Sequence, residues 1–362
     1  QTLYGMADLF IIGQFGEVAD ITAVSIGSQV MHMLTVMIVG LAMGATVTIG
    51  RNVGAKKSKE AANAVGNTAT LFILVSVVIT VILLAAVKLI VNIMSTPKEA
   101  VPGTAAYLTV CFIGIPFITA YNIISSVFRG MGDSKSPMYF IAAACAANIA
   151  LDYLFMGAFK MGPVGAALGT TLSQTISVII ALAAILKKDM GIHLCKKDFK
   201  PVKKIMGQIL KIGVPVALQD GFIQIAFIVI TIIANKRGLN DAAAVGIVEK
   251  VIGILFLVPS SMLSSVSALA AQNIGANKPD RAKLTLRYAA IITVAFGTAI
   301  AIATQFCSEQ IVGIFKSDGG VMRLGGQYLR SYVWDCICAG IHFCFSGYFC
   351  AMEKSGISFL HN

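Results

Sequence analysis

Long apolar runs, separated by short polar connections, make up most of the chain. A membrane-spanning helix needs about 20 apolar residues, and nine runs in the sequence are long enough. These runs cover residues 22–50, 65–94, 104–128, 138–159, 163–186, 208–235, 243–271, 284–315 and 328–351. One more run, at 3–15, would reach only about 20 Å as a helix, against a hydrocarbon core of about 30 Å. We therefore expect ten transmembrane helices, the first of them truncated, with bends at Pro116 and Pro259.

The chain matches itself when it is shifted by 221 residues. The shift places Asn52-Val53-Gly54-Ala55 on Asn273-Ile274-Gly275-Ala276, Tyr107-Leu108 on Tyr328-Leu329, and Phe128 and Met131 on Phe349 and Met352. Similar membrane composition alone would give matches among Leu, Ile and Val, whereas these matches include loop positions. Because six spans separate equivalent helices, both halves enter the membrane in the same direction. This is a parallel repeat with a pseudo-two-fold axis along the membrane normal.

The repeat predicts how the chain is divided into domains. Residues 1–186 are expected to form an N-terminal lobe of six helices, 187–207 a basic linker, and 208–362 a C-terminal lobe. Asn362 corresponds to position 141, near the start of a helix, so we expect the C-terminal lobe to lack its last two helices. The predicted fold is therefore an all-α integral membrane protein whose parent has two six-helix lobes.

Composition narrows the class of protein. Apolar residues make up 57% and charged residues 12% of the 362 residues, whereas soluble domains average about 45–50% and about 25%. A soluble enzyme and a disordered chain are therefore excluded. The eight Cys show no CxxC or CxxH spacing and nearly all lie in apolar runs, so we expect them to be small buried apolar residues, not disulfides or metal ligands. We expect no cofactor apart from a coupling ion, Na⁺ or H⁺.

The net charge of +11 indicates how the chain is oriented in the bilayer. Nineteen of the 28 Lys and Arg lie in alternate connections, on one predicted side of the membrane, and seven lie on the other. The positive-inside rule then places the N-terminus and the 187–207 linker in the cytoplasm of a multi-pass plasma-membrane protein. The Lys of this linker have only Phe199 as an interleaved aromatic and lie between two membrane bundles, which argues against nucleic-acid binding.

Four polar residues of the N-terminal half lie within predicted spans. Asp8 lies in the middle of the first, short run, and Asn148 and Asp152 are four residues apart, so these two share a helix face. Thr170 adds a hydroxyl from the following span. Two carboxylates, an amide oxygen and a hydroxyl suit Na⁺, or a proton shared between the carboxylates. The alternative is that Asp152 hydrogen-bonds a neighbouring helix and Asp8 faces a loop, but intramembrane acids favour a functional role.

Other polar residues are candidates for a substrate cleft. They are Gln29, His32, Asp220, Glu249 and Asp335. Acidic side chains in a cleft would attract cations, although Glu249 stands beside Lys250 and each acid also has a structural interpretation near a helix end. The 221-residue shift places Val229 opposite Asp8, so the charged sites of the two halves have diverged.

Four motifs, taken together, are similar to those of one transporter family. They are Ala7-Asp8-Leu9-Phe10-Ile11-Ile12-Gly13, Arg51-Asn52-Val53-Gly54-Ala55, Phe128-Arg129-Gly130-Met131-Gly132-Asp133-Ser134-Lys135-Ser136-Pro137 and Asn148-Ile149-Ala150-Leu151-Asp152. The whole chain resembles the multidrug and toxic compound extrusion (MATE) family, and within it the DinF and MepA-type branches. The resemblance implies two six-helix lobes around a central cleft, and export of cationic or amphipathic compounds driven by inward Na⁺ or H⁺.

The resemblance also implies site residues. The family's N-lobe cation site has Asp, Asn, Asp and Thr at the positions of Asp8, Asn148, Asp152 and Thr170. Its NorM-type branch adds a Glu and an Asp in the C-lobe. Here the Glu position falls near Ile223 and Gln224, and Asp335 lies about a turn from the Asp position. We therefore place the coupling ion in the N-lobe and leave a C-lobe ion site open.

These observations predict a secondary multidrug antiporter, not an enzyme, that works as a monomer in the lipid bilayer. It would export small organic cations or amphipathic drugs in exchange for Na⁺ or H⁺. One alternative is a lipid-linked precursor flippase of the same architecture, which needs a cationic cleft for pyrophosphate, whereas the charges within the spans here are mostly acidic. Another is an integral-membrane enzyme, but the sequence has no HExxH motif, no Ser/His/Asp set and no phosphate loop in or near the spans.

Overall fold

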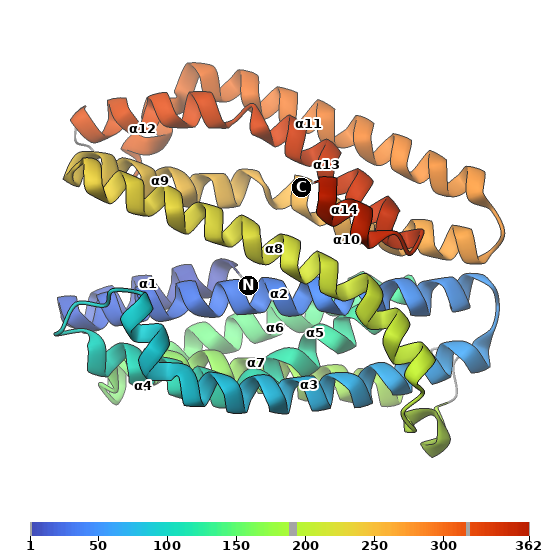
Figure 1. Ribbon diagram of the computed structural model, residues 1–362. Helices are drawn as coiled ribbons and strands as arrows, with labels where there is room; N and C mark the ends of the chain where they lie inside the picture. The colour runs from blue at the N-terminus through green and yellow to red at the C-terminus, as the bar shows by residue number, and fades with distance from the viewer. Residues whose placement is uncertain (1, 188–193, 316–318, 362) are drawn as a thin grey trace. The chain divides into compact units, whose positions relative to one another are not determined.

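Helices form almost all of the computed structural model, which describes residues 2–187, 194–315 and 319–361 (Figure 1). No strand occurs in these ranges. The chain divides into two compact units. The N-lobe consists of Gln1–Val53 and Lys57–Leu210, and the C-lobe of Gly54–Lys56 and Lys211–Asn362. The all-α architecture that the sequence predicted is confirmed.

The N-lobe is a bundle of long helices with two short irregular turns. Its elements are α1 (Thr2–Phe15), α2 (Val18–Gly54), α3 (Ser58–Ile93), α4 (Val101–Ile113), α5 (Ile115–Gly130), α6 (Lys135–Asp152), the π-helical turn η1 (Tyr153–Ala158), α7 (Gly162–Lys187) and the 3-10 turn η2 (Lys196–Phe199). Within the lobe α1 packs against α6, η1 and α7, and α7 packs against α4, α5 and α6. The interior therefore lies between helices from the start, middle and end of the lobe.

The C-lobe is built from the second set of helices. Its elements are α8 (Lys203–Arg237), α9 (Leu239–Leu255), α10 (Leu257–Gly275), α11 (Pro279–Gly313), α12 (Gly319–Tyr332), α13 (Asp335–Ala351) and α14 (Ser355–His361). Helix α8 begins within the N-lobe and continues into the C-lobe. Part of the predicted linker 187–207, residues 188–193, lies outside the described residues.

The helices are long and apolar enough to cross a membrane. Seven spans pass by length and hydropathy among the described residues, and nine pass if each of two bent helix pairs counts as one span. At 14 residues, α1 is shorter than a span, as the pattern predicted. The chain is thus a multi-pass membrane protein.

Two predicted spans are bent pairs of helices: the break in 104–128 agrees with the bend predicted at Pro116, whereas the break in 328–351 was not predicted. The predicted span 104–128 consists of α4 and α5, which meet at 48° around Gly114. Pro116 lies two residues after the break and lacks the N–H that a continuous helix needs. The predicted span 328–351 consists of the end of α12 and of α13, which meet at 41° without a proline at the break.

The 221-residue shift also relates the ends of the helices. Helix α2 begins at Val18 and ends at Gly54, and the pair α9 and α10 begins at Leu239 and ends at Gly275, each 221 residues later. Ser58 begins α3 and Pro279 begins α11, which are again 221 residues apart. The two halves therefore share one helix pattern.

Candidate functional site

Three of the polar side chains singled out in the sequence are buried together in the N-lobe. Asp8 is 2% exposed, and Asn148 and Asp152 are fully buried. Asp8 comes from the middle of α1, whereas Asn148 and Asp152 lie one turn apart at the end of α6. Asn148 and Asp152 are both close enough to interact with the Asp8 carboxyl group. The packing of α1 on α6 thus joins residues that are 140 positions or more apart in sequence.

Thr170 completes the predicted set. It lies in the first half of α7, and its hydroxyl donates a hydrogen bond to Oδ2 of Asp8 at 3.0 Å. This bond connects α7 to α1 across the interior of the lobe. The four residues that the sequence placed in one site are therefore close together in the structure.

Most of the polar atoms in this cluster have no hydrogen-bond partner among the residues that the structure describes. These atoms are Oδ1 of Asp8, both side-chain polar atoms of Asn148 and both carboxylate oxygens of Asp152. On α7, Oγ1 of Thr171 and Oε1 of Gln174 are also buried without a partner. Buried polar groups in native proteins are nearly always satisfied, because an unmet hydrogen bond costs about 1–3 kcal/mol. Such a concentration of unpartnered oxygens fits a site that receives a cation or a proton.

Gly169 makes room for the Asp152 carboxylate, and the sequence analysis missed it. A Cβ at position 169 would overlap Oδ1 of Asp152 and come within 3.6 Å of Nδ2 of Asn148. Gly169 is buried in α7, directly before Thr170. A glycine beside a candidate ligand was the available signal, but glycine is also common in membrane helices for packing reasons alone.

A π-helical turn follows the cluster directly. Helix α6 ends at Asp152, and η1 covers Tyr153–Ala158, where the sequence predicted a regular helix to residue 159. π-helical turns carry an extra residue and occur frequently at functional sites. The turn η1 packs against α1 and α7, the helices that carry Asp8 and Thr170. It therefore lies next to the cluster, between the end of α6 and the start of α7.

Helix α4 adds two buried side chains next to the acids. Tyr107 lies in the electrostatic field of both Asp8 and Asp152, and Cys111 lies in that of Asp8. Both side chains belong to the large apolar cluster of the lobe interior, together with Ile11 and Ile12 of α1. The acids are therefore enclosed by apolar and aromatic neighbours, an environment in which uncompensated charge is costly. Tyr107 was noticed in the sequence only as part of the repeat.

The chemistry of the cluster favours a hard cation or a proton. No group of three or more His, Cys, Asp or Glu in the described ranges is arranged to hold a metal ion. The donors here are carboxylate, amide and hydroxyl oxygens, which suit Na⁺ better than a transition metal. Two carboxylates in a water-poor interior repel one another strongly, and either Na⁺ or a proton between them would relieve this repulsion.

The residues proposed for a substrate cleft belong to both lobes, and within either lobe taken by itself they do not form a second such cluster. Gln29 and His32 are exposed on α2 of the N-lobe. In the C-lobe, the Thr231 hydroxyl donates to Oε1 of Glu249 at 2.9 Å. Glu249 and Asp335 both lie near the Tyr332 side chain, whereas Asp220 lies near Cys350.

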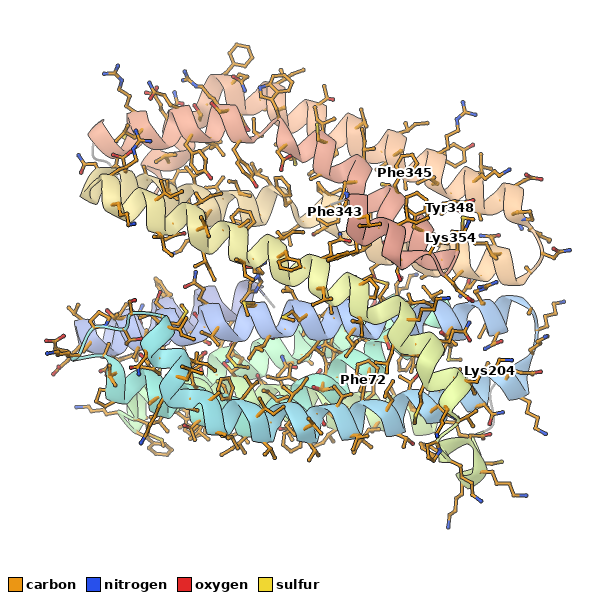
Figure 2. The ribbon with its side chains drawn as sticks, in the orientation of Figure 1. Phe72, Lys204, Phe343, Phe345, Tyr348 and Lys354 are labelled. Carbon is orange, nitrogen blue, oxygen red and sulfur yellow. The ribbon has the colours of Figure 1, made fainter. Side chains whose placement is uncertain are left out.

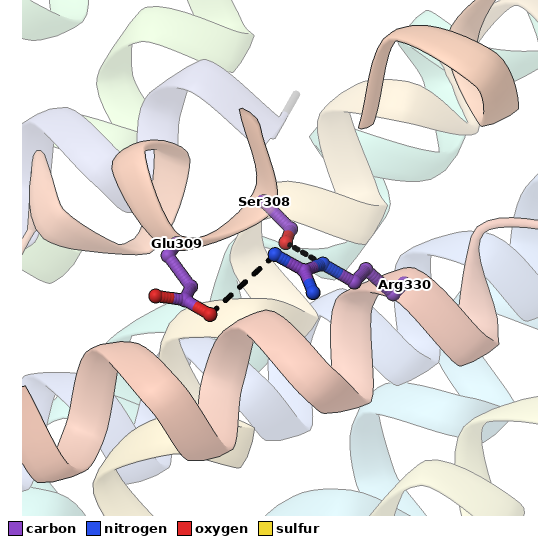
Figure 3. Close-up of polar contacts among 3 residues, drawn as sticks. All are labelled: Ser308, Glu309 and Arg330. Atoms are coloured by element: carbon purple, nitrogen blue, oxygen red, sulfur yellow. Dashed lines mark hydrogen bonds and ion pairs between the residues drawn. The ribbon is translucent and has the colours of Figure 1, made fainter. Parts of the chain in front are cut away.

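Several polar groups of the C-lobe find partners within the lobe, although the buried hydroxyls of Ser264 and Tyr328 have none among the described residues. Nε of Arg330 on α12 donates to the Ser308 hydroxyl of α11 at 2.6 Å, and its Nη2 lies 3.4 Å from Oε1 of Glu309 (Figure 3). A second network is centred on Gln219. Its Nε2 is hydrogen-bonded to Nε2 of His342 at 3.0 Å, and its Oε1 accepts a hydrogen bond from the Ser358 hydroxyl, also at 3.0 Å. These contacts connect helices and have their donors matched to acceptors.

Known proteins are similar to this chain in sequence and in fold. The protein is 27% identical over 347 residues to "Probable multidrug resistance protein YoeA" of Bacillus subtilis, a match that covers 94% of this chain and 75% of YoeA. It is 24% identical to "Multidrug export protein MepA" of Staphylococcus saprophyticus, covering 95% of this chain and 76% of MepA. A crystal structure of MATE in the bent conformation matches with a TM-score of 0.91 at 22% identity, over 99% of this chain and 80% of the other.

The family model MatE matches residues 1–154 and 215–362, which is most of the chain and includes both lobes. The matched ranges contain Asp8, Asn148 and Asp152, the three buried polar residues of the N-lobe cluster. The chain therefore belongs to the MatE family of multidrug and toxic compound extrusion transporters.

Proposed function

We propose that this protein is a secondary antiporter that exports organic cations or amphipathic drugs in exchange for Na⁺ or H⁺. The coupling ion binds at Asp8, Asn148, Asp152 and Thr170. One observation carries this proposal: two carboxyl groups are buried side by side in the N-lobe, and most of the oxygens around them have no partner. The names of the relatives YoeA and MepA support drug export as the direction of transport.

The cluster couples ion binding to helix movement through electrostatics. Without an ion, the carboxylates of Asp8 and Asp152 repel one another, which loosens the packing of α1 on α6. Na⁺ or a proton removes this repulsion and draws the two carboxyl groups together, while Thr170 holds Asp8 from α7. Because Asp152 is followed directly by the π-helical turn η1, the end of α6 is a place where the helix accommodates such a shift.

The substrate binds elsewhere, and the candidate residues for binding it are Gln29, His32, Asp220, Glu249 and Asp335. Acidic groups in this set attract an organic cation. Ion binding at the N-lobe cluster lowers the affinity of the transporter for the drug, and alternating access exchanges one for the other. The transporter works as a monomer in the plasma membrane, with its N-terminus and the 187–207 linker on the cytoplasmic side.

Transport into proteoliposomes tests the proposal. Uptake of a fluorescent organic cation is driven by a Na⁺ gradient at constant pH, or by a pH gradient without Na⁺. Asp8→Asn and Asp152→Asn remove one charge each while keeping nearly the same shape. We expect both variants to insert normally and to lose gradient-driven transport. Asp280→Asn is the matched control, because Asp280 lies on α11 with 95% of its side chain exposed.

Full gradient-driven transport by both Asp8→Asn and Asp152→Asn would contradict the proposed coupling site. Comparison of the two gradients identifies the coupling ion. The flippase alternative is tested with the same vesicles and a fluorescent lipid-linked pyrophosphate, whose translocation we expect to be absent, because a pyrophosphate would be repelled by the acidic residues proposed for the cleft.

A further inference from the structure

The segment that precedes α8 is fixed to the surface of α3 by hydrogen bonds. Nδ2 of Asn67 donates to the backbone carbonyl of Asp198 at 3.2 Å, and Oδ1 of Asn67 accepts a hydrogen bond from the backbone N–H of Val202 at 2.6 Å. Asn67 is fully buried. An amide in an apolar span is costly without partners, and this contact explains why Asn67 lies there.

Neighbouring residues of α3 complete the contact. The Thr70 hydroxyl donates to the backbone carbonyl of Phe199 at 2.8 Å. Gly66 lets the backbone of the segment approach closely, because a Cβ there would overlap the carbonyl of Asp198. Within the segment, Oδ2 of Asp198 accepts the backbone N–H of Cys195 at 2.7 Å. Residues 195–202 therefore have a fixed position on α3.

This fixed segment presents a strongly basic surface. Five Lys and a single Asp occur within residues 194–204, and Asp198 is buried while all five Lys are exposed. The Lys are Lys196, Lys197, Lys200, Lys203 and Lys204. Lys204, labelled in Figure 2, lies near the start of α8, beside the end of η2. We name residues 194–204 the basic platform.

Apolar side chains are exposed among these Lys. Leu194 is 41% exposed, and Phe199 and Val202 are each 42% exposed. The platform also connects two membrane spans, since α7 ends at Lys187 and α8 begins at Lys203. A surface of Lys with exposed aromatic and aliphatic groups, placed where spans end, has the composition of a membrane-interface element: the ammonium groups reach phosphates while the apolar groups enter the headgroup boundary.

We propose that the basic platform binds the anionic phospholipids of the bilayer, with its Lys on the headgroup phosphates and Phe199 in the interface. Charge complementarity and the exposed apolar groups favour a lipid surface over a soluble polyanion, which would not use Leu194, Phe199 or Val202. Because the platform is hydrogen-bonded to α3 and leads directly into α8, bound lipid also fixes the start of α8 relative to α3.

A fluorescent probe at the platform tests this proposal without depending on transport. The chain has a single Trp, Trp334, so Trp334→Phe with Phe199→Trp leaves one Trp, located in the platform. The protein is reconstituted in zwitterionic vesicles that contain a small, equal fraction of either brominated phosphatidylglycerol or brominated phosphatidylcholine. Both lipids carry bromine near the headgroup end of the acyl chain and quench Trp on contact.

We expect the anionic lipid to quench about threefold more than the zwitterionic lipid at the same fraction, and we expect this preference to fall as salt is raised. The combined variant Lys196→Gln, Lys197→Gln and Lys200→Gln should bring the two lipids to equal quenching. Neutralising Lys56, Lys57 and Lys59 to Gln removes the same number of exposed charges from another connection and should leave the preference unchanged.

Two results would overturn the proposal. Equal quenching by both lipids in the unmodified platform would show that it does not select anionic headgroups. Absence of quenching by either lipid would place the platform away from the bilayer, as expected for a soluble polyanionic partner. Gly66→Ala, which displaces the platform from α3, should reduce the preference, whereas Gly207→Ala should not, because open space surrounds position 207.

Discussion

The two lobes share a helix pattern but differ in what they bury. In the N-lobe, α2 runs without interruption from Val18 to Gly54, whereas its counterpart in the C-lobe is broken at Phe256, three residues before Pro259. In the N-lobe two acids and an amide lie in the interior with most of their atoms unpartnered. In the C-lobe, Arg330 of α12 and Glu309 of α11 are paired although both are partly exposed, and the buried groups without a partner among the described residues are the hydroxyls of Ser264 and Tyr328, not acids.

We propose that this difference separates two tasks on one scaffold. A paired network stabilises helix contacts and resists change, because breaking it leaves buried groups unsatisfied. An unpaired network in a buried, apolar interior is costly unless an ion binds, and its energy would then depend on the ion concentration. On this interpretation the N-lobe cluster responds to ion binding, whereas the paired contacts of the C-lobe (the C-lobe frame) hold its helices together.

The largest effect is expected for Gly169→Ala in the N-lobe. The new Cβ would overlap Oδ1 of Asp152 and displace the carboxylate from the cluster. Overpacking of this kind costs about 1–3 kcal/mol, and we expect gradient-driven transport to be lost. Gly13→Ala on α1 is the control, because open space surrounds that position. The loss of stability is measured by thermal melting and the loss of coupling by gradient-driven transport, both in proteoliposomes. Full coupled transport in Gly169→Ala would show that the position of Asp152 is unimportant.

Thr170→Val should have a smaller effect in the same lobe. It removes the hydrogen bond of 3.0 Å to Asp8 and keeps the shape of the side chain. A hydrogen bond to a charged group is worth about 1.5–3 kcal/mol, and this one stabilises the ionised carboxylate. Its loss should therefore change the apparent affinity for the coupling ion about tenfold or more: the affinity falls if the ion is Na⁺, which also loses a hydroxyl ligand, and rises if the ion is a proton. The control is Thr175→Val, whose hydroxyl donates a hydrogen bond to the carbonyl of Thr171 on its own helix. An unchanged ion dependence of transport in Thr170→Val would remove Thr170 from the site.

Glu249→Gln tests whether the C-lobe takes part in coupling. The substitution removes the charge but keeps an oxygen for the Thr231 hydroxyl. We expect the substrate KM to rise severalfold, because an acid proposed for the cleft is lost, while the dependence of transport on the ion stays as it is. Loss of ion dependence equal to that of Asp8→Asn would instead place a coupling site in the C-lobe.

The smallest effect is expected for Glu309→Gln. This change weakens the contact with Nη2 of Arg330, while the hydrogen bond from Arg330 to Ser308 remains. Both charged side chains are partly exposed, so the pair is worth at most about 1 kcal/mol. We expect a small fall in melting temperature and normal transport. A large loss of transport would mean that the C-lobe frame also takes part in the response to the ion.

The sequence predicted the parts of this comparison that depend on spacing along the chain. Asn148 and Asp152 are four residues apart and share a face of α6, as helical geometry requires. The 221-residue shift, found in loop motifs, also relates the ends of helices α2, α9 and α10. The basic composition of 194–204 was visible too, although it was interpreted only as a signal of orientation.

The sequence did not predict features that arise from packing between distant segments. The room that Gly169 gives to Asp152 depends on how closely α6 and α7 approach, which no local pattern specifies. The π-helical turn at Tyr153–Ala158 and the bend before Asp335 have no proline to signal them. The sequence also did not predict the hydrogen bonds from Asn67 to the segment before α8, because an isolated Asn in a long apolar run does not indicate which residues it will contact.

Linkage between ion and drug tests the central claim most directly. If the N-lobe cluster binds the coupling ion, raising Na⁺ or lowering pH must weaken drug binding, since coupling between two ligands is reciprocal. Binding of a fluorescent organic cation to the purified transporter is therefore measured across a range of Na⁺ concentration and pH. We predict that Kd rises with the coupling ion in the unmodified protein and in Glu249→Gln, and is independent of it in Asp8→Asn and Asp152→Asn. An ion-dependent Kd that persists in both N-lobe variants would contradict the account.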